Sequence, residues 1–469
     1  MSRSGVRSLG GYAIDRRPLD IPAYRRLWVA SVVCAVGGSF SVVAIPAQLF
    51  TMTGSSATVG ASAVVSLVTL VAAALWTGAL ADVRDRRKVL LAAHCGLAVT
   101  YAALWTQAAL GGGSVPVLML LVGCQGLTFG AIMTTMGAAV PRLVPIELLP
   151  AANSLSQLVR YAGSILGPVL AGVLIPIVGL STLYLFDAVA LLAVVWAVIK
   201  LPPLPPRPHP NGASNDPVRP YRQGGSTIGQ VLAGCRYLAA SRLLVAVLAV
   251  DLAAMVLGMP TALFPQLAQR TYGGPAGGGM QLGLLYAAYP AGVVAVGLMS
   301  GTFTRARRHG ALMAAAAAAW GITLVVLGLA PRLWIALAAL VLGGAVNFVL
   351  STFRNAISQA LTDDVMRGRI QGSLTVVLIG GPQIGNLLHG TSASIFGPRM
   401  VICAGGLLTT LVVAVIAWAV PELSQYTAQR ASEAGPGEAA LTGPRRPERE
   451  GDASPRAVPG AERSTDPAG

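Results

Sequence analysis

Long apolar windows recur along this 469-residue chain. Each has about twenty residues, enough to cross the roughly 30 Å hydrocarbon core of a bilayer as an α-helix. Strand-type alternation is absent, and the windows are too long and continuous for the ten-residue pattern of an outer-membrane barrel. The pattern therefore predicts transmembrane helices over 27–50, 58–80, 89–110, 115–140, 151–178 and 180–199, and again over 243–268, 281–303, 311–330, 333–353, 370–396 and 400–420.

The windows form two groups of six with a polar segment between them. We predict an all-α integral membrane protein of twelve transmembrane helices in two six-helix bundles, 27–200 and 243–421. The linker at 201–242 is rich in Pro and Gly, which do not propagate a helix, and its end predicts an amphipathic helix on the cytoplasmic surface. Residues 1–26 form a basic tail, and residues 422–469 predict a disordered, cytoplasmic one.

The charge of the chain follows this arrangement. Hydrophobic residues make up 54% and charged residues only 11%, against roughly 25% charged residues in soluble domains. Most lysines and arginines lie in alternate connections and at both ends, while the other short loops hold only Arg270, Arg332 and Arg399. Because basic segments resist translocation, both termini are predicted to be cytoplasmic, and the net charge of +15 reflects topology and not nucleic-acid binding. The N-terminus lacks the short apolar core of a cleavable signal peptide.

The sequence lacks the residue patterns of several kinds of functional site. Neither lysine, Lys88 or Lys200, stands in the Gly-Lys-Ser/Thr context of a phosphate-binding loop, so ATP is not expected as a partner. No two histidines stand four residues apart, and the five cysteines are scattered, so neither a zinc site nor a disulfide framework is predicted. We expect no cofactor, no metal and no enzyme activity, although catalytic residues that meet only in space leave no mark in the sequence.

The connection "GALADVRDRRKVL", Gly78 to Leu90, concentrates charge between the second and third windows. Such a cluster is also typical of a generic stop-transfer signal. However, "GTFTRARRHGALM", from Gly301, repeats the glycine, a bulky apolar residue and the basic run in the second half, as a parallel duplication of six-helix halves would. The Gly-x-Leu-x-Asp pattern, the basic run and the six-linker-six layout resemble the major facilitator superfamily, whose two bundles are pseudo-symmetric.

The resemblance implies a gating role for Gly78, Asp82, Arg86 and Arg87. In this superfamily the loop acts as a cytoplasmic latch, made in the outward-open state and broken in the inward-open one. Asp82 would face the positive N-terminal end of a neighbouring helix. Arg86 and Arg87 would reach carboxylates or carbonyls across the two halves.

The fifth window contains "GSILGPVLAG", which resembles the antiporter motif of exporters through Gly163, Gly167, Pro168 and Gly172. Glycines at i and i+4 allow close helix approach, and the proline can bend the helix. Ordinary small-residue packing is the alternative. The eleventh window repeats the element as "IGGPQIGNLLHG", which favours export.

Further phrases, including "YRRLW", "AIPAQLFTMTGSS" and "PRLVPIELLPAANSL", resemble the branch that contains bacterial enterobactin exporters, the transmembrane secretion effectors. The likeness covers residues 20–425. Two departures stand out: Val122 occupies the position of the exporters' arginine in the fourth helix, and the first helix carries no acid. Both put a simple transfer of proton-coupling residues in doubt.

Ionisable residues inside the apolar windows are candidate functional residues, because inserting a charge at the centre of a transmembrane helix costs about 2.5–3.5 kcal/mol. Asp251 and Arg160 lie about 12 and 14 Å from the cytoplasmic ends of their helices. Since the first, fourth, seventh and tenth helices line the cavity in the superfamily, Asp251 is the candidate for a proton or cationic-substrate site; a structural pair is the alternative. Arg160 shares a face with Gly163 and Gly167 and is expected to bind an anionic group or to pair with Asp251 or Asp187.

Asp187, on the usually peripheral sixth helix, is interpreted as structural. Gln125, Asn347 and Asn386 offer hydrogen bonds to a cavity, or join helices. Together these features predict a secondary transporter of the bacterial inner membrane that exports a small organic molecule, such as a siderophore, another secondary metabolite or a drug, by alternating access with proton antiport. The alternatives are a nutrient facilitator or importer and, in another class, a membrane-embedded enzyme or a non-transporting scaffold.

Overall fold

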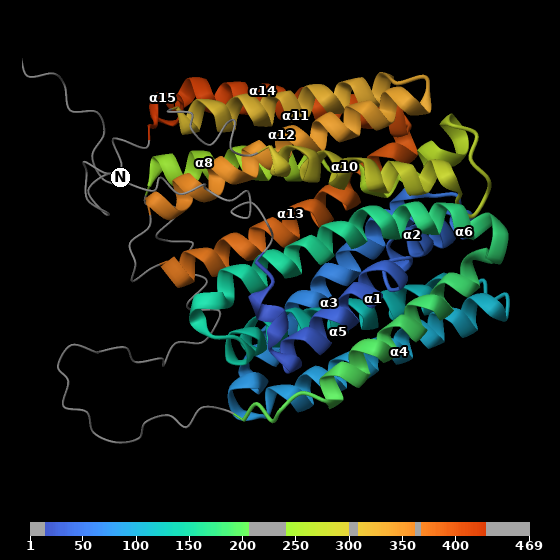
Figure 1. Cartoon of the computed structure of the whole chain (residues 1–469). Helices are drawn as coiled ribbons and strands as arrows, with labels where there is room; N and C mark the ends of the chain where they lie inside the picture. Colours follow the sequence, from blue (N-terminus) through green and yellow to red (C-terminus); the bar gives the residue numbers. More distant parts are fainter. Residues whose placement is uncertain (1–14, 206–240, 300–307, 362–366, 428–469) are drawn as a thin grey trace, which may run out of the picture.

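The computed structural model describes residues 15–205, 241–299, 308–361 and 367–427, which form the helical body in Figure 1. The side chains of residues 78, 79, 81–83 and 367–377 lie outside this description. We call 15–205 the N-terminal half and 241–427 the C-terminal half. The described segments are helices joined by short connections, and ten of these helical stretches are long and apolar enough to cross a membrane. The predicted all-helical membrane fold is confirmed at this level.

The N-terminal half consists of η2 (Arg17–Asp20), α1 (Pro22–Gly37), α2 (Ser41–Thr53), α3 (Ser56–Val83), α4 (Arg86–Ala109), α5 (Val115–Leu143), η3 (Ile146–Leu148) and α6 (Leu149–Ile199). With 51 residues, α6 would extend about 76 Å if straight, more than twice the hydrocarbon thickness. It divides at Gly179, whose φ of 79° is not helical. The two arms of α6 correspond to the fifth and sixth predicted windows.

The C-terminal half consists of α8 (Arg242–Val256), η4 (Thr261–Leu263), α9 (Phe264–Gln266), η5 (Leu267–Thr271), α10 (Met280–Leu298), α11 (His309–Leu329), α12 (Leu333–Ala360), α13 (Arg367–Phe396), α14 (Pro398–Ala419) and α15 (Pro421–Gln425). The ten apolar stretches count α6 once and omit α13. The predicted number of twelve crossings therefore rests on taking both arms of α6, and α13, as separate crossings.

Several predicted boundaries differ from the observed elements. Helix α1 begins at Pro22, inside the predicted N-terminal tail. At the other end, α15 occupies the first residues of the predicted disordered tail, and Leu423 is buried there against Gly310 of α11. The predicted surface helix before residue 242 and the remaining tail residues lie largely outside the described part.

The first long segment of each half is broken in its middle. In the N-terminal half, α1 ends after 16 residues and α2 begins at Ser41. In the C-terminal half, α8 ends after 15 residues and η4 begins at Thr261. The similar position of the two breaks is what a duplicated six-helix unit would produce.

Each half has a hydrophobic core of its own. One core cluster joins α1 and α2 to α3, α4, α5 and the second arm of α6. The larger cluster joins the helices of the C-terminal half and also takes in residues of α2 and α6, such as Ala47 and Ile175. Both clusters therefore extend across the boundary between the halves, since the smaller one includes Ala262 of η4.

Glycine-lined seams join the halves along α6 with α10 and along α3 with α13. A Cβ atom at Gly172 would lie 3.0 Å from the Cα of Gly283, and a Cβ at Gly60 would lie 2.5 Å from the carbonyl oxygen of Asn386. Only residues without a side chain allow backbones to approach so closely.

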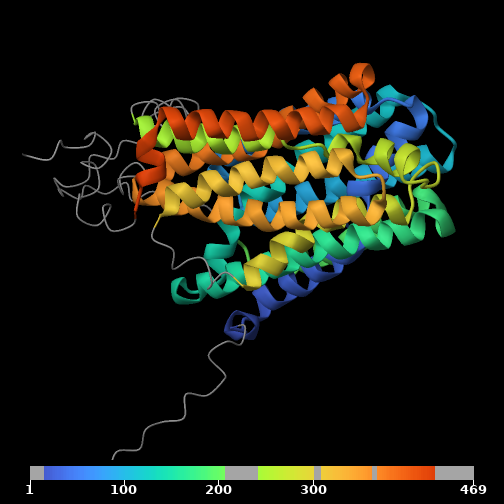
Figure 2. The same cartoon turned by 90° about the horizontal axis from the view of Figure 1, so that it is seen from above.

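Polar contacts also join the two halves, at the end of the molecule opposite Pro22 and Gln425. Ser56 Oγ donates to Gln266 Oε1 at 2.7 Å, and Arg270 donates to the Gly54 carbonyl at 3.3 Å. The Arg270 guanidinium also lies 5.5 Å from the centre of the Phe50 ring. We call this end, opposite Pro22 and Gln425, the closed end. Figure 2 shows the helices of the two halves drawing together there and spreading apart toward the end that carries the termini.

Candidate functional site

Asp251 forms a buried ion pair with Arg354. Arg354 Nη1 lies 2.9 Å from each carboxylate oxygen of Asp251, and the two side chains are 7% and 1% exposed for Arg354 and Asp251, respectively. Asp251 comes from α8 and Arg354 from α12, so the pair connects the equivalents of the seventh and tenth predicted helices. A buried charge without a partner would be strongly unfavourable, so each residue accounts for the presence of the other.

Arg354 is the site residue that the sequence reasoning missed. The predicted tenth span ends at residue 353, which leaves Arg354 in a connecting segment. Instead α12 continues to Ala360, and the Arg354 side chain points into the half, where Asn355 Oδ1 also accepts from it at 3.1 Å. A lone arginine on a helix that also carries Asn347 at i−7 was the available signal.

Arg160 does not pair with either acid, contrary to one of the expectations. It is exposed on α6 and donates to Gln157 Oε1 of the same helix. Arg160 lies on the same face of α6 as Gly163 and Gly167, which pack on α1 and on the segment that follows it. A guanidinium on this face, with only a neutral partner, is available to an anionic or oxygen-rich ligand.

The glycines of the predicted antiporter motif are helix contact points. A Cβ at Gly163 would lie 2.8 Å from the Ala35 carbonyl oxygen, and one at Gly167 would lie 2.6 Å from Ser39 Cβ. These contacts bring the first arm of α6 against α1 and the start of the break that follows it. Pro168 is buried, and its carbonyl oxygen faces Gly283 of α10.

The repeated element on α13 makes equivalent contacts. A Cβ at Gly381 would lie 3.1 Å from Met255 Cβ, and one at Gly385 would lie 2.8 Å from the Met255 and Val256 carbonyl oxygens. Thus α13 packs on α8, just before its break, as α6 packs on α1. The sequence duplication is therefore matched by a duplicated packing arrangement.

The arginines of the predicted gating loop bind carbonyls within their own half. Arg86 Nη1 donates to the Ala138 carbonyl at 3.4 Å, and Arg87 Nη2 donates to the Ile199 carbonyl at 2.5 Å. These described contacts differ from the expected ones across the halves, which spread apart toward this end in Figure 2. The side chain of Asp82 and the surroundings of Gly78 lie outside the described part.

Asp85, in the same loop, has a clear structural role. Its Oδ1 accepts from the backbone N–H of Arg87 at 2.9 Å, which caps α4, and from the N–H of Leu204 at 3.1 Å. A carboxylate is favourable at a helix N-terminus. The loop is thereby fastened to the segment that leaves α6.

The three candidate amides are occupied within their own halves. Gln125 donates to Tyr101 at 3.1 Å, and Asn347 accepts from Tyr289 at 2.9 Å. Asn386 Oδ1 accepts from the Thr261 side chain at 2.6 Å and from the Ala262 N–H at 3.0 Å, so it caps the element that follows the break in the seventh predicted helix.

Asp187 has a comparable place at the other break. It is fully buried and accepts from the backbone N–H groups of Phe40 and Ser41, at 3.1 and 2.8 Å, and from the Ser41 hydroxyl. It therefore caps the N-terminus of α2 from the second arm of α6.

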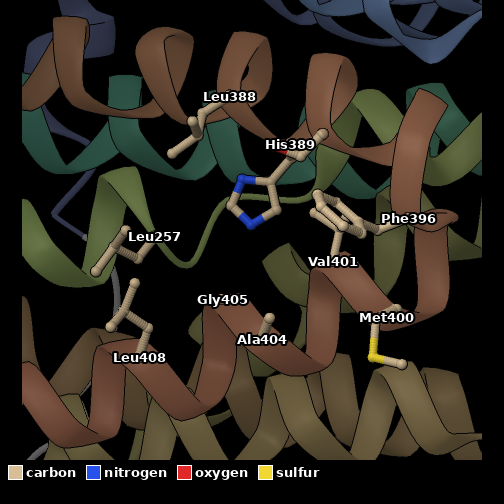
Figure 3. A pocket seen from close by; sticks show the side chains of 10 residues that line it. Leu257, Leu388, His389, Phe396, Met400, Val401, Ala404, Gly405 and Leu408 are labelled. Atoms are coloured by element: carbon tan, nitrogen blue, oxygen red, sulfur yellow. The ribbon is translucent and has the colours of Figure 1, made fainter.

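A cavity of about 360 Å³ lies among α8, α13 and α14. Figure 3 shows the His389 imidazole between Leu388 and Val401 in this cavity, which is otherwise mostly apolar. His389 Nδ1 lies 2.8 Å from the Gly385 carbonyl one turn back on α13. All lining residues belong to the C-terminal half, so this cavity is not a route between the halves.

Two halves with duplicated packing, in contact at one end and each broken in its first helix, have the architecture of the major facilitator fold. Solved structures agree on this fold. The nucleoside transporter NupG superposes with a TM-score of 0.63 at 14% identity, over 86% of this chain and 100% of that one. A bacterial homologue of the human lysosomal transporter Spinster, in an inward-facing and unoccupied conformation, gives 0.63 at 13% identity, over 86% and 97%.

The family follows from sequence. The transmembrane secretion effector family matches residues 15–442, and the chain belongs to it. Curated relatives include the enterobactin exporter EntS of Shigella dysenteriae, 30% identical over 82% of this chain and 88% of that protein. The EntS protein of Citrobacter koseri is 29% identical over 83% and 91%. The resemblance inferred from the sequence motifs is confirmed.

Proposed function

We propose that this chain exports a small organic molecule across the bacterial inner membrane by alternating access, driven by proton entry. The contact between the halves at one end carries the proposal, because a carrier of this kind must close one side while the other is open. With both termini cytoplasmic, the described conformation is closed toward the outside and open toward the cytoplasm. This is the state in which an exporter takes up its substrate.

The seams suggest how the halves move. Gly172 with Gly283 and Gly60 with Asn386 bring the two halves into backbone contact at the closed end, whereas the glycines that face α1 and α8 hold each half together. The halves can therefore rock against each other as bodies. In the opposite state Asp82 and the released arginines, Arg86 and Arg87, would engage the C-terminal half and complete the latch.

The pair of Asp251 and Arg354 is suited to coupling. In the described state Arg354 compensates the Asp251 carboxylate, so a proton reaches Asp251 only when the arginine moves away. An anionic group of a substrate would compete with Asp251 for Arg354. Proton entry and substrate release would thus depend on the same pair, as reciprocal coupling requires.

The relatives and Arg160 bear on the substrate. Proteins named enterobactin exporters match along most of the chain, and the exposed Arg160 offers charge-assisted hydrogen bonds to oxygen-rich groups. A siderophore or a comparable secondary metabolite is therefore the substrate class that we propose.

Everted membrane vesicles test direction and coupling together, with enterobactin as the first probe. An exporter driven by proton antiport should accumulate enterobactin in vesicles with an acidified lumen, and collapse of the pH gradient with an ionophore should release it. Vesicles with Asp251→Asn should equilibrate the probe without concentrating it. Accumulation only in right-side-out vesicles would instead identify an importer.

A further inference from the structure

Two buried acids, Asp251 and Asp187, and one amide, Asn386, lie at the ion pair and at the two helix breaks. Among the described residues, only Asp251 has a cation beside it. Asp251 pairs with Arg354, and Asn386 caps the break of the seventh predicted helix. Asp187 caps the equivalent break after α1. We propose that Asp187 is a second proton-binding site, in the N-terminal half, and that its protonation state sets the position of α2.

The surroundings of Asp187 are neutral. Among the residues that the structure describes, no lysine, arginine or histidine pairs with it. Its hydrogen-bond donors are two backbone N–H groups and the Ser41 hydroxyl. The titratable groups near it are Cys34 on α1, Tyr101 on α4 and Tyr184 on α6 itself. A proton can therefore bind Asp187 without breaking an ion pair, unlike a proton that binds Asp251.

The Ser41 hydroxyl suits both states of the carboxyl group. It donates to the carboxylate in the described state, and a hydroxyl can equally accept from a protonated carboxyl. A further polar pair nearby includes Gln125, which donates to Tyr101 at 3.1 Å.

The consequence of protonation follows from what α2 carries. The carboxylate opposes the positive end of α2, an interaction that protonation weakens. Farther along α2, a Cβ at Gly278 of the C-terminal half would lie 3.5 Å from Ala47 Cβ, and Phe50 stacks with Arg270. The helix that Asp187 caps is therefore a helix that seals the closed end. Loss of the negative charge would loosen α2 and favour opening of that seal.

The C-terminal half provides a natural comparison. Its break is capped by a neutral amide, Asn386, so an asparagine can do the structural work of such a cap. The caps come from helices that are not equivalent, the second arm of α6 and α13, so the acid is a feature of the N-terminal half alone. Asp187→Asn keeps one of the two acceptor oxygens of this cap and removes the carboxyl group that would bind the proton.

The inference rests on the proposed proton antiport for its physiological role, but proton binding is measured without transport. Infrared difference spectra of the purified full-length protein in lipid, recorded between acidic and alkaline pH, report the carboxylic-acid C=O band of each buried acid that titrates. We expect such a band in the wild-type protein, its loss in Asp187→Asn, and its retention in a control that carries both Asp251→Asn and Arg354→Met, which removes the buried ion pair as a unit. Asn386→Asp should add a new band.

Hydrogen exchange gives the second measurement. After correction for the intrinsic effect of pH, the amides around Phe40 and Ser41 should exchange faster at acidic pH in the wild-type protein and show no such change in Asp187→Asn. If Asp187→Asn does not fold, Ser41→Ala should shift the frequency of the band, because a hydroxyl partner is gone. A band that is absent from the wild type, or unchanged in folded Asp187→Asn or in Ser41→Ala, overturns the proposal. Proton-driven export without this band would leave the proposed function standing and refute Asp187 alone.

Discussion

Replacing Arg354 by methionine should destabilise the protein and uncouple transport. Methionine keeps much of the side-chain volume but leaves Asp251, 1% exposed, without its cation. Removing one partner of a buried ion pair costs about 3–5 kcal/mol. For a half of this size, that corresponds to a fall in melting temperature on the order of 10 °C. Protonation of the stranded carboxyl would recover part of the loss.

The double variant Asp251→Asn, Arg354→Met is the matched control. It removes both charges, so it should melt much closer to the wild-type protein than Arg354→Met does. The assay is the fraction of monodisperse protein left after heating in detergent, measured by size-exclusion chromatography. Transport follows in everted vesicles, where Arg354→Met should not concentrate enterobactin. If Arg354→Met melts like the wild-type protein and accumulates enterobactin as well, the pair contributes neither to stability nor to coupling, and the reasoning is refuted.

Three further changes test other parts of the site. Gly167→Leu should abolish flux or leak protons, because even a Cβ would lie 2.6 Å from Ser39 Cβ, against about 3.5–4.0 Å for ordinary contact. The control Gly137→Leu should be tolerated, because a Cβ there would meet no atom within 4 Å. Equal proton leak and flux in the two variants would refute a role of the glycine motif in transport. Asp82→Asn should leave expression unchanged but slow turnover, and full turnover would reduce the loop to a topology signal. Arg160→Gln should weaken binding of enterobactin in a direct titration without loss of melting temperature, since its partner is an exposed neutral residue; unchanged affinity would exclude its role.

The helical membrane fold follows from sequence because apolar length is a local property. An apolar window of about twenty residues indicates directly that the segment spans the bilayer as a helix. The observed helices begin and end within a few residues of most of these windows. The broken helices leave a local trace as well, in the glycines before Ser41 and the Gly-Met-Pro stretch before Thr261. The glycine motif predicts close approach, and the structure adds which helix is approached.

The partners in the site depend on tertiary packing and could not be read in the same way. Arg354 lies 103 residues from Asp251, and Asp187 lies 146 residues from Ser41. No periodicity connects positions so far apart. A polar residue near the end of a window reads equally well as the start of a loop, so Arg354 was placed outside the membrane. The interpretation of Asp187 as structural rests on the usually peripheral place of the sixth helix, and nothing local in the sequence shows which broken helix it meets.

The central claim, export, is tested most directly by comparing metabolites inside and outside cells of the source bacterium with and without this gene. Quantitative mass spectrometry of cell extracts and culture supernatants requires no assumption about the identity of the substrate. We predict that at least one small, oxygen-rich metabolite rises inside the deletion strain and falls in its supernatant, and that the wild-type gene restores both levels while Gly167→Leu does not. A compound that instead falls inside the deletion strain and remains in its medium would contradict export and identify an importer.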